Sequence, residues 1–169
     1  MAEEMGGRRG RGTRSGRLNM MNAGHQILSH SGDLALEAWA PDKGECIAHA
    51  MEALVESFAD VRQALPREHV KFTAKEPSDE GLLVAVLDDV IYQLDVHGLL
   101  PVDISVDTQP AQPEGISADT LPASADVRFA AVRADEAELT GAVPKAVSPH
   151  ELRFGRDGEL WRCHVTVDT

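Results

Sequence analysis

Residues 24–60 read GHQILSHSGDLALEAWAPDKGECIAHAMEALVESFAD, and the spacing of their apolar residues changes part-way along. Residues 33–40 alternate between apolar and other side chains, which predicts a half-buried strand. In residues 41–60 the apolar positions recur every three or four residues, which predicts an amphipathic helix. Asp42 is a suitable N-cap for this helix, and Glu45 three residues later completes a capping-box pattern. We therefore expect a strand that leads directly into a helix.

The same two spacings continue through the rest of the sequence. Ser78 and Gly98 are the start and stop signals of a second helix that lies between them. Alternating segments predict further strands at residues 69–75, 99–107, 125–134, 145–154 and 160–168. Two amphipathic helices with about six strands predict an α+β fold, a single two-layer domain in which both helices pack on one mixed, largely antiparallel sheet.

The distribution of charge limits the kind of partner that the protein can bind. The chain has 169 residues and a formal net charge of −12. Residues 1–22 are rich in Gly and Arg, and we expect them to be a disordered tail that precedes a domain at 23–169. This domain is strongly acidic, so we expect no stable direct binding to nucleic acid, which needs Lys and Arg at its phosphates. An acidic body instead suits a basic protein surface or a divalent cation.

The sequence also indicates where the protein resides. No apolar run approaches the roughly 20 residues of a membrane-spanning helix. The N-terminus is polar and Arg-rich and lacks the apolar core of a secretion signal. These observations predict a cytoplasmic protein with no membrane partner.

Asp33 and Asp168 are the candidate metal ligands. Asp33 stands at the start of the first predicted strand, and Asp168 stands at the end of the last one. Hard cations need convergent oxygen ligands, and these two carboxylates would supply them if the two strands lie close together. Thr169 would add a backbone carbonyl or a terminal carboxylate. Taken singly, Asp33 is typical of a turn residue and Asp168 of an exposed terminal acid.

His30, Lys145 and His150 are candidate supporting residues for this site. A histidine suits metal ligation or acid–base chemistry, although a lone histidine is more often a hydrogen-bonded structural residue. Ser148 lies close to Lys145 and His150 in the sequence, which raises the question of a nucleophile. No strained elbow of the G-x-S-x-G type surrounds this serine, and its absence argues against nucleophilic catalysis.

Two other sets of polar residues carry no recognisable motif. No two histidines lie four residues apart with a glutamate between them, so the sequence has no zincin-like signal. The other histidines show no constellation either, namely His25, His49, His69 and His164. The acidic pair Asp88 and Asp89 lies within the second predicted helix and is most simply a solvated helix face.

Three blocks of the sequence resemble the archease family. They are HSGDLALEAWAPDKGECIAHAMEALVESFADV, EGLLVAVLDDVIYQLDVHGLLP and the closing PKAVSPHELRF…GELWRCHVTVD. The most specific elements are the His-x-x-Asp start, the KAV-x-x-H element and the strand-borne aspartate near the end of the chain. Ser148 and Pro149 stand where the family commonly has Thr-Tyr, and Pro149 predicts an edge or a bulge because it lacks a backbone N–H.

The resemblance implies a small α+β protein that is not itself an enzyme. Archeases activate the GTP- and metal-dependent ligase of tRNA splicing and RNA repair, by promoting guanylylation of the ligase histidine and multiple turnover. The required acids correspond by motif to Asp33 and Asp168, with Thr169 as a backbone ligand. The bound ion would be Ca²⁺, Mg²⁺ or Mn²⁺, and the RNA-splicing ligase would be the protein partner.

Two other functions stay open at this point. One is a chaperone-like modulator of another RNA-modifying enzyme, such as a methyltransferase. The other is a metal-dependent hydrolase built from Asp33, Asp168 and His150, which predicts turnover by the isolated protein.

Overall fold

The computed structural model describes residues 22–30, 33–109 and 122–169, and of His30 and Asp33 it describes the backbone. Almost all of the predicted tail at 1–22 lies outside these residues. The division into a tail and a domain at 23–169 therefore stays a prediction. No helix within the described ranges is long and apolar enough to cross a membrane.

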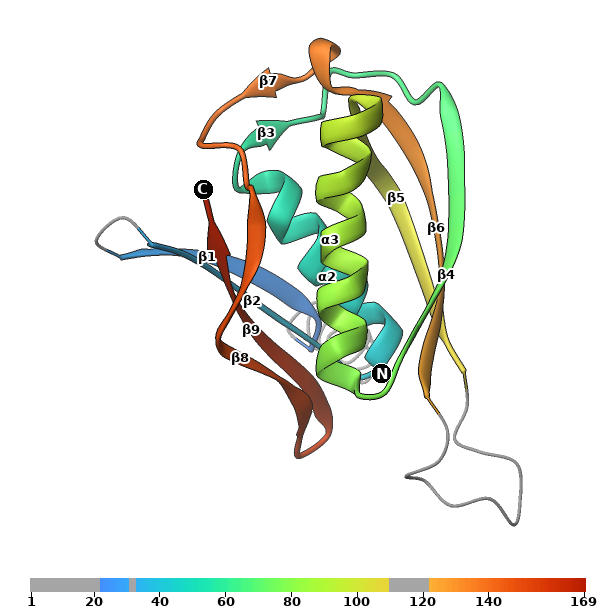
Figure 1. The fold of residues 1–169 in the computed structure, drawn as a ribbon, viewed down its shortest axis with the longest axis vertical. Coiled ribbons are helices and arrows are strands. Elements are labelled where there is room, and N and C mark those ends of the chain that lie inside the picture. The colour runs from blue at the N-terminus through green and yellow to red at the C-terminus, as the bar shows by residue number, and fades with distance from the viewer. Residues whose placement is uncertain (1–21, 31–32, 110–121) are drawn as a thin grey trace, which may run out of the picture.

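The described chain forms two α-helices and nine strands (Figure 1). The strands form a four-stranded sheet of order β1-β2-β9-β8, a three-stranded sheet of order β4-β6-β5 and a small β3-β7 pair. Every strand pair is antiparallel. The elements are β1 (Gly24–His30), β2 (Asp33–Ala40), α2 (Lys43–Glu56), β3 (Ala59–Asp60), β4 (Glu68–Glu76), α3 (Asp79–His97), β5 (Leu99–Thr108), β6 (Ala123–Arg133), β7 (Glu138–Leu139), β8 (Ala146–Asp157) and β9 (Leu160–Asp168).

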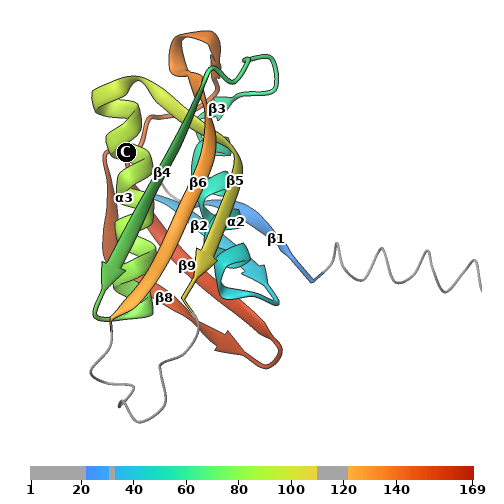
Figure 2. The same ribbon diagram turned by 90° about the vertical axis from the view of Figure 1, so that its right-hand side faces the viewer.

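The two helices lie between the four-stranded and the three-stranded sheet, as Figures 1 and 2 show from perpendicular directions. The α+β class is confirmed. The prediction of two layers, with both helices on one sheet of about six strands, is wrong, because the strands form separate sheets on two sides of the helices. The physical reason is that helix α2 is covered on two sides, by β2 and by β5. A helix that is apolar around most of its circumference is buried on more than one side. Its buried residues are Gly44, Cys46, Ile47, Ala50, Met51, Ala53, Leu54 and Val55.

The residues that were expected to cap the two helices do so. The Asp42 side chain accepts a hydrogen bond from the Glu45 N–H at 3.1 Å and caps α2. Ser78 caps α3 in the same way. Gly98 ends α3 in the left-handed conformation, with a φ of 64°. Gly158, with a φ of 67°, lies in the tight turn between β8 and β9, where an Asp-Gly pair is typical of a hairpin. The predicted helix ends are therefore confirmed.

Three strands were not predicted, namely β1, β3 and β7. Strand β1 is an edge strand whose apolar pattern is weak, and its Ile27 is 38% exposed. The β3–β7 pair is only two residues long on each side, too short to give a periodic signal. The expected irregularity at Pro149 is confirmed, because the register of β8 against β9 shifts between Ser148 and Arg153.

The acidic pair on α3 does not form a simple solvated face. Asp88 is exposed, but Asp89 is only partly so. Among the described residues, the Asp89 Oδ2 atom is buried and has no hydrogen-bond partner. Burial raises the pKa of Asp89 above its ordinary value of 3.8, and a hydrogen bond with Gln93 only partly opposes this. The charged form of Asp89 therefore costs free energy in the folded state.

An Asp89→Asn variant is expected to be more stable than wild type at neutral pH, by about 1 kcal/mol. Because the pKa of Asp89 is raised, the folded wild type is destabilised by the charge at pH values above this pKa. The destabilisation disappears as the pH falls and Asp89 takes up a proton. Urea denaturation at pH 7.5 should therefore separate the two proteins, and the difference should shrink near pH 4. A gain that is equal at both pH values would show that the charge is not its cause.

Candidate functional site

The two candidate metal ligands lie at one end of adjacent strands. Strands β2 and β9 are neighbours, and their register pairs Leu34 with Val167. Asp33 and Asp168 are the next residue on each strand at this end. The Asp168 side chain is exposed. The condition that the first and last predicted strands lie close together is therefore met, while the role of these residues as metal ligands stays a prediction.

Strand β8 covers the other side of the Asp168 backbone. Lys145, just before β8, donates its backbone N–H to the Asp168 carbonyl oxygen at 2.8 Å. Ala146 is paired with Asp168. One residue further, the Val147 N–H donates to the Asp88 carboxylate on α3. The end of β9 thus lies between β2 and β8, and β8 is in turn hydrogen-bonded to α3. Lys145 lies directly beside Asp168.

The two candidate supporting histidines differ in position. His30 is paired with Asp33 at the end of the β1–β2 ladder, so it lies at the same end of the sheet. His150 lies further along β8, away from the strand end, because Ser148 is already paired with Thr166, two residues before Asp168. Its backbone N–H donates to the Ser148 Oγ atom at 3.1 Å. The serine hydroxyl therefore caps the local backbone, and the structure does not bring His150 to the strand end.

A polar network across three strands fixes the middle of the same sheet. His164 on β9 contacts Glu37 on β2, with 2.9 Å between Nδ1 and Oε2. Gln26 on β1 donates to the other oxygen of Glu37 at 2.6 Å. These two hydrogen bonds, that of His164 first, lower the pKa of Glu37 below its ordinary value. Glu37 therefore stays a carboxylate that ties β1 and β9 to β2, and this contact supports the register that places Asp33 near Asp168.

The residues at the strand end suit a hard cation. Aspartates stand at this end of both neighbouring strands, at Asp33 and Asp168, and the third predicted ligand is the backbone carbonyl of Thr169, which follows directly. Such a set consists of oxygen atoms alone, which Ca²⁺, Mg²⁺ and Mn²⁺ prefer over nitrogen or sulfur. The exposure of Asp168 leaves room for water and for a partner's oxygen atoms.

Comparison with known proteins decides the family. The model of the archease protein family matches residues 25–169. The chain belongs to the archease family. Two curated archease relatives, each named a probable protein archease, come from Mycobacterium tuberculosis strains CDC 1551 and H37Rv. Each is 40% identical over 147 residues, which cover 87% of this chain and 75% of the relative.

Solved structures show that the archease fold is retained at low sequence identity. The solution structure of Methanobacterium thermoautotrophicum protein 1598 has a TM-score of 0.72 at 17% identity, over 86% of this chain and 99% of that one. The crystal structure of an archease from Thermotoga maritima, described as a possible chaperone, has a TM-score of 0.56 at 22% identity. It covers 85% of this chain and 96% of its own.

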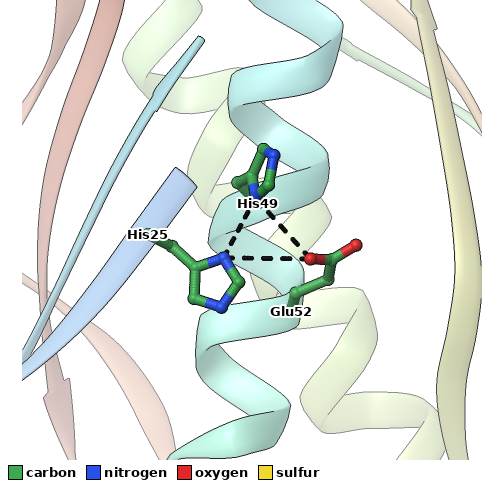
Figure 3. A group of neighbouring side chains, drawn as sticks. All are labelled: His25, His49 and Glu52. Carbon is green, nitrogen blue, oxygen red and sulfur yellow. Dashed lines mark hydrogen bonds and ion pairs between the residues drawn. The ribbon is translucent and has the colours of Figure 1, made fainter. Parts of the chain in front are cut away.

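This archease also contains a group of side chains of metal-ligand type away from the strand end. His25 on β1 meets His49 and Glu52 on α2 (Figure 3), and the three could hold a metal ion. The expectation that His25 and His49 belong to no constellation is therefore wrong. They lie 24 residues apart in the sequence, and only the unpredicted strand β1 brings them together. The available signal was the His-x-x-Glu spacing, which places His49 and Glu52 on one face of a helix.

Proposed function

We propose that this archease is a non-enzymatic, metal-binding activator of a GTP-dependent RNA-splicing ligase. It would promote guanylylation of the ligase and repeated turnover in tRNA splicing and RNA repair. The observation that carries the proposal is the position of Asp33 and Asp168 at one end of two adjacent strands. Membership of the archease family favours this ligase as the partner, and the acidic body suits a basic enzyme surface better than RNA.

The two acids and the carbonyl of Thr169 would hold the divalent ion. When bound, such an ion neutralises charge on a nucleotide phosphate while the phosphate is attacked. The contribution of the chain would be to place oxygen ligands at the end of two interior strands. The hydrogen bond from Lys145 to Asp168 and the pairing of Leu34 with Val167 hold the backbone of this strand end. The Lys145 side chain is exposed beside Asp168 and suits a contact with a phosphate.

A chaperone-like role is the second candidate, because the related Thermotoga maritima protein is described as a possible chaperone. In this case the protein would change the folding or solubility of an RNA-modifying enzyme, with no specific effect on nucleotide transfer. A hydrolase is less well supported, because His150 lies apart from the strand end and Ser148 is engaged with the backbone.

The direct test is ligase self-guanylylation with labelled GTP and a divalent metal, with and without this protein. An activator is expected to accelerate labelling at amounts below one equivalent and to produce no labelled or hydrolysed product when incubated alone. A cognate ligase that gains neither rate nor turnover would contradict the proposal. A gain in soluble, folded ligase without a gain in rate per folded molecule would instead support the chaperone-like role.

A further inference from the structure

Three ligand atoms from β1 and α2 converge beneath the four-stranded sheet (Figure 3). The Nδ1 atoms of His25 and His49 are 3.0 Å apart. The Glu52 Oε2 atom lies 3.8 Å from the first and 3.6 Å from the second. In the plane of these three atoms, the point that is equidistant from them lies about 2.0 Å from each. This is the length of a bond from zinc to nitrogen or to a carboxylate oxygen.

A fourth side chain fixes the proton on His25. The His25 Nε2 atom lies 2.6 Å from the Glu56 Oε2 atom, one turn after Glu52 on α2. A hydrogen bond to this carboxylate needs the proton on Nε2, so a neutral His25 turns the lone pair of Nδ1 toward His49 and Glu52. A histidine that binds a metal almost always donates its second N–H to such a partner. The cluster therefore has both the ligands and the supporting contact of a metal site.

The chemistry of this set differs from that of the strand end. Two imidazole nitrogens and one carboxylate suit Zn²⁺ or a similar transition metal, whereas Ca²⁺ and Mg²⁺ prefer oxygen ligands alone. The His25 side chain is 15% exposed, that of His49 is 28% and that of Glu52 is 43%, so the site opens to solvent on the side of Glu52. Three protein ligands leave a fourth position for water or for a group from a partner.

The location of the cluster suggests what an ion would do there. Among the strands that the structure describes, β1 lies at the edge of its sheet and pairs with β2 alone. His25 is paired with Ala38, five residues from Asp33 along β2, which is roughly 17 Å. The cluster is thus separate from the strand end, although the same β1–β2 ladder joins them.

We propose that His25, His49 and Glu52 form a Zn²⁺-class site, with Glu56 orienting His25, and that the bound ion fastens edge strand β1 to helix α2. This proposal is independent of the proposed ligase activation, because none of its residues belongs to the strand-end set. An ion that binds only the folded state stabilises it, so β1 and the protein as a whole gain stability when the ion is present.

The test is titration of the full, tag-free and chelator-treated chain with Co²⁺, whose tetrahedral complexes absorb visible light, followed by displacement with Zn²⁺. Wild type is expected to bind one equivalent with a tetrahedral spectrum and to melt at a higher temperature with Zn²⁺. His49→Ala and Glu52→Gln should weaken binding by about 100-fold or more, and Glu56→Gln by about 10- to 100-fold. His49 is on a helix and partly exposed, and Glu52→Gln keeps the shape of the side chain, so both variants should fold.

A matched variant serves as the control. His69→Ala removes an exposed histidine on β4, outside the cluster. It is expected to bind Co²⁺ as wild type does. The proposal is overturned if wild type takes up no stoichiometric Co²⁺, or if His49→Ala and His69→Ala bind it equally. A melting temperature that responds to pH and not to Zn²⁺ would show that the cluster shares protons and holds no ion.

Discussion

An Asp168→Asn variant is expected to stimulate ligase guanylylation about 100-fold less than wild type, or worse, because it removes one of the two carboxylates proposed to hold the ion. Asp168 is exposed at the end of β9, so its replacement should leave the core and the free energy of unfolding nearly unchanged. Asp33→Asn should behave alike if both acids bind one ion. Initial rates of labelled guanylylation at several metal concentrations would measure the effect.

Asp157→Asn is the matched control for this experiment. Asp157 lies at the opposite end of the β8–β9 pair, where its side chain is 77% exposed and forms an ion pair with Arg162. We expect it to activate as wild type does. Higher metal concentration should partly restore Asp168→Asn if the defect is one of metal affinity. Full activity of Asp168→Asn at limiting metal would show that the ion is not held at this strand end.

A Gly44→Ala variant is expected to reduce the free energy of unfolding by about 3 kcal/mol. A Cβ atom at Gly44 would lie 2.2 Å from the Val106 carbonyl oxygen on β5 and 3.1 Å from the Asp42 carboxylate. The first contact involves backbone, so the first turn of α2 and strand β5 would have to move apart. This is where the helix meets the three-stranded sheet, and equilibrium urea denaturation would measure the loss.

Gly155→Ala provides the comparison, since no heavy atom lies within 4 Å of a Cβ atom placed there. Its free energy of unfolding should stay within about 0.5 kcal/mol of wild type. A Gly44→Ala protein as stable as Gly155→Ala would mean that α2 and β5 are less closely packed than the structure shows.

The sequence predicts elements well where the determinants are local. Asp42, Ser78 and Gly98 mark helix ends because the relevant hydrogen bonds and backbone angles involve residues only a few positions away. The arrangement of strands depends on distant contacts. An alternating strand has one buried face whichever sheet it joins, so the pattern of β4 or β6 could not show that they form a second sheet.

The candidate sites show the same limit. Asp33 and Asp168 could be placed at strand ends from the sequence, but their proximity depends on β2 pairing with β9, which no local pattern reveals. The cluster of His25, His49 and Glu52 was harder to foresee, because it needs β1, whose weak alternation gave no strand prediction. Once β1 pairs antiparallel with β2 over α2, His25 reaches the helix face that carries the other two.

The interior position of β9 determines when during synthesis the protein can fold. Glu37 and His164, which are paired across β2 and β9, are 127 residues apart in the chain. A nascent chain that has not reached β9 leaves one edge of β2 unpaired and has no strand to join β2 to β8. Closure of such a long loop is slow, and the unpaired edge invites association with other chains meanwhile. The four-stranded sheet is thus completed only after translation has passed residue 168. A chain that stops short of β9 therefore lacks the Asp168 carboxylate of the proposed metal site.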